Sequence, residues 1–143
     1  MVVRAWEEKD IDTILEIERR CFKDPYTREM LLWDMEGMFG YTFLIEDEGQ
    51  VCGYASMNVL FEDAEVGNVA VDEPFRRRGY GKILMDAMHE KAKELGAERV
   101  LLEVRVSNAP AVRLYESLGY EHFSVRKRYY SDGEDAYVMQ KRL

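Results

Sequence analysis

Apolar and polar residues alternate along the chain in two kinds of pattern. Segments rich in β-branched and aromatic residues predict strands over residues 2–6, 41–46, 51–60, 65–71, 99–106, 122–129 and 135–140. Apolar residues three and four positions apart predict helices over residues 11–22, 28–36, 83–95 and 109–118. Turn-forming residues separate these segments, so the pattern predicts seven strands and four helices.

Capping residues define the predicted ends of these elements. Asp10 or a neighbour, Thr27 and Asn108 precede helical patterns and are predicted N-caps. Gly96 and Gly119 follow the third and fourth helical patterns and are predicted to stop them. Two further turn sequences predict hairpins, at residues 47–50 and 131–134.

The order of the elements, β-α-α-β-β-β-α-β-α-β-β, predicts the fold class. A helix connects the fourth and fifth strands, so these two strands are expected to run parallel, which excludes a purely antiparallel sandwich. We therefore predict an α/β (α+β) fold with a mixed central sheet of about seven strands and four helices on both faces. With 143 residues and no linker or repeat, residues 1–143 are expected to form one domain.

The segment from Glu65 to Gly96 carries the strongest local signal. Its strand ends at Asp72 and Pro74, and its helix begins after the sequence RRRGYGK at residues 76–82. Backbone N–H groups and a partial positive charge at a helix N-terminus attract anions, and glycines let an anion approach those amides. Four cationic side chains in this turn, in a chain of net charge −8, favour a phosphate-binding turn over a solvated basic loop.

Two common nucleotide-binding patterns do not fit this turn. The P-loop requires four residues between its first glycine and its Gly-Lys pair, followed by Ser or Thr, whereas one residue separates the glycines here and Ile83 follows Lys82. The dinucleotide pattern G-x-G-x-x-G fails because Leu84 takes the place of the third glycine. The residues do match Gln/Arg-x-x-Gly-x-Gly/Ala, as Arg76-x-x-Gly79-x-Gly81.

Composition and charge exclude several classes of protein. No apolar run approaches the roughly 20 residues of a membrane-spanning helix, and the N-terminus lacks the apolar core of a signal peptide. We therefore expect a cytoplasmic protein without a membrane partner. The acidic balance argues against direct nucleic-acid binding and suits a cationic amine or basic peptide. Two cysteines and two histidines are too few and too scattered for a disulfide framework or a zinc site, so no metal is expected: Cys21, Cys52, His89 and His122.

Three side chains near the expected ligand site can be interpreted in two ways. Glu103 lies within an otherwise apolar strand, so it either pairs with Arg105 on the same face or lies at a site that raises its pKa. Tyr115 shares a helical stripe with leucines, as a core tyrosine also would. Glu65 opens the fourth strand and is either a solvated strand end or a rival base.

The phosphate-binding turn resembles the acetyl-CoA pyrophosphate loop of the GNAT acetyltransferase superfamily. The sequence LEVRVSNAPAVRLYESLGY at residues 102–120 resembles the second signature of that superfamily, and RKRYYSDGEDA at residues 126–136 is similar to its RimI-type alanine N-acetyltransferases. The similarity covers nearly the whole chain and is weakest before residue 40. There the branch's Phe-x-x-Pro-Trp-Ser appears as Phe22-x-x-Pro25-Tyr26-Thr27.

The resemblance implies a role for each matching residue. Glu103 would be the general base and Tyr115 the general acid. The strand residues Val69, Ala70 and Val71 would pair with the pantetheine arm, and Asn108 would bond it. The pyrophosphate would be held by residues of the turn: Arg77, Arg78, Gly79, Tyr80, Gly81 and Lys82. Arg126, Lys127, Tyr129 and Tyr130 are either residues of the acceptor groove or an ordinary hairpin surface.

The implied activity is direct transfer of acetyl from acetyl-CoA to a protein N-terminal amine. The resemblance implies the N-terminal alanine of small-subunit ribosomal protein eighteen as acceptor. We expect a monomer or weak dimer, although the sequence does not determine the oligomeric state. Three alternatives remain open: a broader N-terminal or small-amine acetyltransferase, a non-catalytic CoA-binding regulatory module, and an interaction domain whose basic turn binds an acidic partner.

Overall fold

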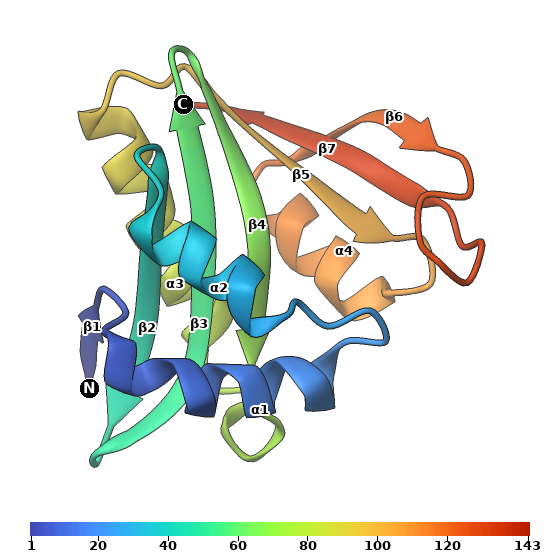
Figure 1. Cartoon of the computed structure of the whole chain (residues 1–143). Coiled ribbons are helices and arrows are strands. Elements are labelled where there is room, and N and C mark those ends of the chain that lie inside the picture. The colour runs from blue at the N-terminus through green and yellow to red at the C-terminus, as the bar shows by residue number, and fades with distance from the viewer.

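The computed structural model describes residues 1–143 and contains one seven-stranded sheet with four helices (Figure 1). The strands are β1 (Val2–Arg4), β2 (Gly40–Asp47), β3 (Gln50–Leu60), β4 (Asp63–Val71), β5 (Arg99–Arg105), β6 (Glu121–Arg126) and β7 (Ala136–Arg142). The helices are α1 (Ile11–Cys21), α2 (Arg28–Glu36), α3 (Tyr80–Glu94) and α4 (Ala109–Ser117). Short 3-10 turns, Glu8–Asp10 and Glu73–Phe75, precede α1 and α3. The predicted fold class is confirmed.

The sheet is mixed, with the strand order β1-β2-β3-β4-β5-β7-β6. Every neighbouring pair is antiparallel except β4 and β5, which run parallel because α3 crosses between them. The last strand, β7, lies between β5 and β6, so the edge strand β6 joins the sheet only through β7.

Strands β4 and β5 pair over a short length and then diverge (Figure 1). Their register covers three pairs, from Asp63 opposite Arg99 to Glu65 opposite Leu101. Farther along β4, its register with β3 shifts between Ala55 and Met57, which marks a bulge. A bulge bends a strand and increases its twist. As a result, the carboxyl-terminal parts of β4 and β5 do not pair with each other.

The two faces of the sheet bury separate clusters of apolar side chains. On one face, α3 and α4 cover a cluster that includes Leu84, Met85, Met88, Val100 and Leu102. On the other face, α1 and α2 cover a smaller cluster that includes Ile11, Ile14, Ile17, Leu31 and Tyr54. Helical spacing of the apolar residues thus places both amphipathic helix pairs against the sheet. One acid, Glu18, lies fully buried on the apolar stripe of α1.

Two predicted caps are confirmed, and several predicted ends differ, since β1 ends at Arg4 rather than Trp6 and α3 begins at Tyr80 rather than Ile83. Thr27 accepts a hydrogen bond from the Met30 N–H, and Asn108 caps α4 in the same way. Asp10 stands at the start of α1 but makes no side-chain cap there, because its carboxylate binds Arg4 at 2.8 and 3.0 Å. The predicted strand over residues 122–129 ends at Arg126. Two residues later Arg128 adopts a left-handed backbone (φ 51), which turns the chain.

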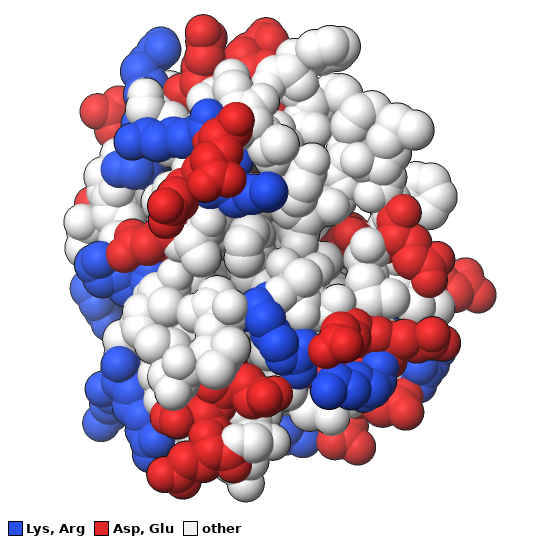
Figure 2. All heavy atoms as spheres, turned by 90° about the vertical axis from the view of Figure 1, so that its left-hand side faces the viewer, with Lys and Arg blue, Asp and Glu red and all other residues white.

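The surface mixes both signs of charge. Figure 2 shows acidic and basic side chains interspersed on the side of the molecule that carries β1 and α3, next to uncharged areas. Exposed apolar residues on α2 and the loop that follows it include Trp33 (74% exposed) and Met38 (86% exposed). None of the helices combines the length and the apolar character needed to cross a membrane.

Candidate active site

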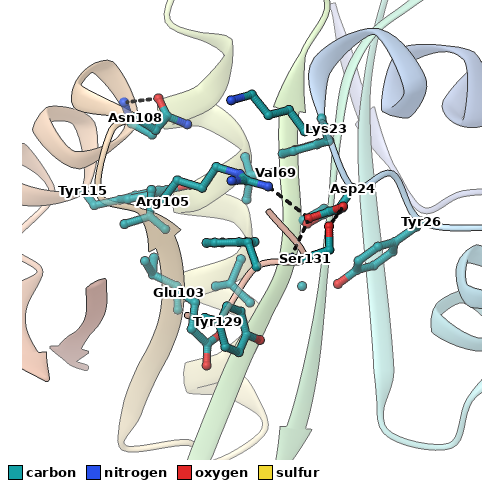
Figure 3. Close-up of a pocket in the computed structure, with 18 residues that line it drawn as sticks. Lys23, Asp24, Tyr26, Val69, Glu103, Arg105, Asn108, Tyr115, Tyr129 and Ser131 are labelled. Carbon is teal, nitrogen blue, oxygen red and sulfur yellow. Dashed lines mark hydrogen bonds and ion pairs between the residues drawn. The ribbon is translucent and has the colours of Figure 1, made fainter. Parts of the chain in front are cut away.

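Two adjoining cavities lie where β4 and β5 diverge. The loop cavity, of about 510 Å³, lies between the α1–α2 loop, β4, β5 and the β6–β7 loop (Figure 3). The turn cavity, of about 860 Å³, lies between the end of β4, the turn before α3 and the start of α4. Seven residues line both cavities and mark their junction: Phe22, Lys23, Val69, Arg105, Asn108, Ala111 and Tyr115. Two ligands that enter from opposite sides would meet at this junction.

The turn cavity exposes the first amides of α3. Gly79 is the N-cap of α3 and has a left-handed backbone (φ 80), a conformation that glycine adopts without a steric penalty. It has no side chain to cap the helix, so the first-turn N–H groups remain free for a ligand. A Cβ atom at Gly81 would lie 3.3 Å from Leu114 Cδ2, so the turn also packs closely against α4. This geometry suits a bound anion.

Two of the predicted cations act at this turn in different ways. Arg77 lines the turn cavity and has a left-handed backbone (φ 67), a strained conformation for a residue with a Cβ. Arg76 also lines the cavity, but its Nε donates to the Val71 carbonyl at 3.0 Å and its Nη2 lies 3.5 Å from Cys21 Sγ. Arg76 therefore braces the end of β4, whereas Arg77 is available to an anion.

The other predicted side chains of the turn point elsewhere. Arg78 lies over the Phe75 ring at 5.5 Å, and Lys82 pairs with Asp86 at 2.6 Å one turn along α3. Neither side chain lines the turn cavity. Tyr80 does line the cavity, but its hydroxyl donates at 2.6 Å to a carboxylate in the β2–β3 hairpin. The side chains of Arg78 and Lys82 therefore contact other residues and lie outside the turn cavity.

The predicted strand residues and Asn108 do come together. Val69, Ala70 and Val71 line the turn cavity along the part of β4 that has no partner on its β5 side. Asn108 Oδ1 accepts a hydrogen bond from the Ala111 N–H at 3.3 Å and so stays at the junction of the two cavities. Unpaired strand backbone can bind an extended ligand as an added strand would.

Glu103 lies mid-strand on β5 and lines the loop cavity (Figure 3). Its side chain is 29% exposed, and its Oε1 lies 3.3 Å from Arg126 Nε. Burial raises the pKa of Glu103, Arg126 opposes this shift, and Glu65 adds to it. The expected alternative, a pair between Glu103 and Arg105, is wrong, because Arg105 binds other carboxylates. A partly buried carboxylate with a raised pKa beside a cavity is suited to accept a proton.

Tyr115 reaches the junction of the cavities from α4. Its side chain is almost fully buried, and burial raises its pKa to about 12, so the phenol is protonated at neutral pH. Its ring centroid lies 5.8 Å from that of Tyr120, whose hydroxyl pairs with His89 Nε2 at 2.6 Å. The tyrosine is therefore both a core residue and a possible proton donor at the cavity, so its two interpretations do not exclude each other.

Arg105 links the α1–α2 loop to the β6–β7 loop across the loop cavity (Figure 3). Its Nη2 donates to Asp24 at 3.0 Å, and Asp24 also accepts a hydrogen bond from the Ser131 hydroxyl. Its Nη1 donates to both oxygens of Asp132 at 2.9 and 3.0 Å, and its guanidinium stacks 4.0 Å from the Tyr130 ring centroid. We call this group of contacts the loop clasp.

The buried carboxylate of Glu18 holds the walls of the loop cavity. It accepts hydrogen bonds from Asn68 Nδ2 at 2.9 Å to each oxygen, from the Tyr26 N–H at 2.7 Å, and from the Tyr54 hydroxyl. Asn68 belongs to the bulged part of β4, and Tyr26 belongs to the α1–α2 loop. One side chain of α1 therefore sets the positions of two cavity walls.

Some site residues were not expected from the sequence. Lys23, Asp24 and Ser131 line the loop cavity, although no role was predicted for any of these three residues. Glu18 could have been found from the sequence, because an acid on an apolar helical stripe is unusual. Of the four hairpin residues considered for the groove, Tyr129 and Tyr130 line the cavity, Arg126 reaches Glu103, and Lys127 faces Asp135. No three His, Cys, Asp or Glu side chains gather closely enough to hold a metal ion.

The chain is similar in sequence to known acetyltransferases. Residues 10–120 match the model of the acetyltransferase (GNAT) family. The chain is 36% identical to an N-alpha-acetyltransferase of Sulfurisphaera tokodaii over 143 residues, covering 91% of this chain and 86% of the relative. It is 32% identical to the ribosomal protein bS18-alanine N-acetyltransferase of Escherichia coli over 140 residues, covering 96% of this chain and 94% of the relative.

A solved structure agrees with these sequence matches. The crystal structure of the ribosomal-protein-S18-alanine N-acetyltransferase from Escherichia coli superposes with a TM-score of 0.90 at 30% identity. The alignment covers 99% of this chain and 92% of that chain. The two folds therefore agree over nearly the whole chain.

Proposed function

The chain belongs to the GNAT acetyltransferase family and is an acetyl-CoA-dependent N-terminal acetyltransferase, and from this premise we propose that its acceptor is the N-terminal alanine of ribosomal protein bS18. The similarity to bS18-alanine N-acetyltransferases carries the choice of acceptor, and two side chains at the cavities support the reaction. Glu103 lines the loop cavity, and Tyr115 lines both cavities. The acetyl donor then occupies the turn cavity, and the acceptor peptide enters through the loop cavity.

The turn cavity fits the donor through backbone and charge. The free amides of the first turn of α3 and the Arg77 side chain bind the pyrophosphate. The unpaired edge of β4 at Val69–Val71 binds the pantetheine arm, and Asn108 binds it from the opposite side. A backbone N–H of this strand segment stabilises the negative charge that develops on the thioester carbonyl oxygen.

The acceptor amine must lose a proton before it attacks. An N-terminal amine has a pKa near 8, so freeing its lone pair at pH 7 costs about 1.4 kcal/mol, whereas a lysine amine costs about 4.6 kcal/mol. Glu103 accepts this proton on a carboxylate oxygen, directly or through one water. The nitrogen then forms its bond to the acetyl carbon as the carbon–sulfur bond breaks, and the Tyr115 hydroxyl donates its proton to the departing sulfur. The second proton of the amine nitrogen returns to the Tyr115 oxygen through water, which leaves a neutral amide, and Glu103 releases its proton to solvent.

A specific assay tests the acceptor. The purified protein is given acetyl-CoA and a peptide copied from the N-terminus of bS18 of the same organism, and thiol release is measured. We expect thiol release together with a product heavier by one acetyl group on the first residue. The same peptide with its N-terminus already blocked is the matched control and should give no thiol. Acetylation confined to an internal lysine would contradict the proposal.

A broader acceptor range is the second candidate. It is favoured by the similarity to an archaeal N-alpha-acetyltransferase and by the wall sequence Pro25-Tyr26-Thr27, which departs from the Pro-Trp-Ser of the alanine-specific branch. Peptides that begin with Ala, Ser or Met, together with a polyamine, distinguish the two candidates when they compete in one reaction. A strong preference for Ala supports the bS18 acceptor, and equal use of all three peptides supports the broader enzyme.

A further inference from the structure

A cation reaches the Glu103 carboxylate from the edge strand of the sheet. Glu103 on β5 lies opposite Val138 of β7, and Arg126 on β6 lies opposite Ala136 of β7. Opposed residues of antiparallel strands project from the same face, and so do residues two apart on one strand. Arg126 and Glu103 therefore share a face, and Arg126 reaches the carboxylate diagonally across β7.

The side chains of β7 leave room for this contact. Ala136 and Val138 are buried between the two strands, and neither carries a polar group on its side chain. Arg126 Nε ends 3.3 Å from Glu103 Oε1, and its guanidinium lies 5.7 Å from the Tyr129 ring centroid. Glu103 is the one carboxylate within ion-pair distance of Arg126 in residues 1–143. The pair is thus oriented by strand register and by an aromatic ring.

Other charged and titratable groups face Glu103 from the surrounding elements. Glu65 acts from β4, and its negative charge raises the pKa of Glu103, whereas Arg126 lowers it and burial raises it most. The cation nearest along β5, Arg105, is held by the loop clasp. The remaining groups are phenols of the α1–α2 loop and of the segment after β6: Tyr26, Tyr129 and Tyr130. Arg126 is therefore the cation that offsets the negative charge of the partly buried Glu103 carboxylate.

We propose that Arg126 is a positioning residue for the general base Glu103: it keeps the Glu103 carboxylate ionised and oriented toward the loop cavity. The negative charge of Glu65 has the opposite effect and favours the protonated carboxyl. This inference rests on the function proposed above. A carboxylate accepts the proton of the amine only in its ionised form, so activity falls as the pH drops through the pKa of Glu103. Removal of Arg126 favours the protonated carboxyl and moves this loss of activity to higher pH. Removal of the Glu65 charge moves it to lower pH.

The pH dependence of kcat/KM tests the proposal with three variants. In Arg126→Gln the acid limb is expected at higher pH than in the wild type, with kcat/KM on that limb reduced roughly two- to fivefold, as for other partly exposed ion pairs. In Glu65→Gln the limb is expected at lower pH. Arg126→Lys retains the positive charge and should restore most of the wild-type profile. The matched control, Arg128→Gln, removes an exposed cation nearby and should leave the profile unchanged.

A direct titration separates this proposal from the proposed function. The Glu103 carboxyl is followed by carbon-13 NMR in the absence of acetyl-CoA and acceptor, with Glu103→Gln to assign the signal. The proposal is supported if the pKa of Glu103 is higher in Arg126→Gln and lower in Glu65→Gln than in the wild type. This result does not depend on whether a given peptide is acetylated. An Arg126→Gln titration that coincides with the wild type overturns it. Failure of the wild type to acetylate any N-terminal peptide overturns the proposed function instead.

Discussion

The turn cavity and the loop cavity are built in different ways. The turn cavity depends largely on backbone from one continuous segment, the end of β4 and the start of α3, with Gly79 where a left-handed residue is needed. The loop cavity depends on side chains that come from α1, both flanking loops, β4, β5 and β6. Binding by backbone tolerates many side-chain changes, whereas a site made of side chains is sensitive to changes at distant positions.

The largest expected effect is on the base at the loop cavity. Glu103→Gln keeps the shape of the side chain but cannot accept a proton, so kcat should fall by about 10²- to 10⁴-fold. The affinity for acetyl-CoA, measured by calorimetry, should remain unchanged because the turn cavity is intact. Glu65→Gln is the matched control and should change kcat far less. The assignment of the base is wrong if Glu65→Gln abolishes turnover and Glu103→Gln does not.

The second effect concerns His89 of α3, which pairs with Tyr120 next to Tyr115. Burial lowers the pKa of His89 to about 4, from an unfolded value of about 6.5. Between these pH values the unfolded chain binds more protons than the folded protein. Neutral His89 therefore makes its full contribution to the free energy of unfolding above pH 6.5, and this contribution is lost as the pH falls toward 4. The free energy of unfolding should drop by about 3 kcal/mol across this window.

Urea unfolding at several pH values measures the His89 effect. His89→Gln should flatten the dependence on pH, because glutamine does not titrate. His122→Gln is the comparison variant, since it replaces the other histidine of the chain at an exposed position. An unchanged slope in His89→Gln would show that other groups cause the acid sensitivity.

The third effect concerns Glu18 of α1, whose hydrogen bonds hold two walls of the loop cavity. Glu18→Gln replaces one of the carboxylate oxygens with an amide donor that faces the donors Asn68, Tyr54 and the Tyr26 N–H. We expect a loss of about 2 kcal/mol in the free energy of unfolding, typical of a lost hydrogen bond to a buried charged group. The KM for the acceptor peptide should rise, and the KM for acetyl-CoA should not. An equal rise in both values would show that the two cavities are not independent.

The smallest effect concerns Arg77, which combines a strained backbone with a charge at the turn cavity. Arg77 has a left-handed backbone that costs a residue with a Cβ about 1 kcal/mol, so Arg77→Gly should raise the free energy of unfolding by up to that amount. It should also weaken CoA binding, because a cation of the turn cavity is lost. Arg128→Gly relieves the same kind of strain at φ 51 outside both cavities, so it should stabilise the protein without changing CoA affinity. Thermal unfolding and calorimetry measure both quantities.

Local patterns predict the turn cavity well because its parts are neighbours in the sequence. The strand ending at Val71, the glycine turn and the cap Asn108 follow from residue types at short spacing, and the structure contains each of them. The side chains of Arg78 and Lys82, which the same pattern offered, lie outside the cavity. The fold class also follows, because element order restricts the possible topologies.

The loop cavity could be predicted only in part. The spacing on β5 offered Arg105 as a partner for Glu103, but pairing across the sheet selected Arg126. Which cation reaches the base depends on β7 lying between β5 and β6, and local spacing does not determine that order. Likewise, the end of β6 depends on the backbone of Arg128, an arginine that carries no turn propensity.

The contact between Asp24 and Ser131 joins residues that are 107 positions apart. Contacts between distant residues form late in folding, because the entropy of closing a long loop opposes them. During synthesis, β4 and α3 emerge well before β7, which must insert beside β5 before β6 and its hairpin can reach the α1–α2 loop. A nascent chain therefore contains the turn before α3 early, and the contact between the two loops that closes the loop cavity forms last.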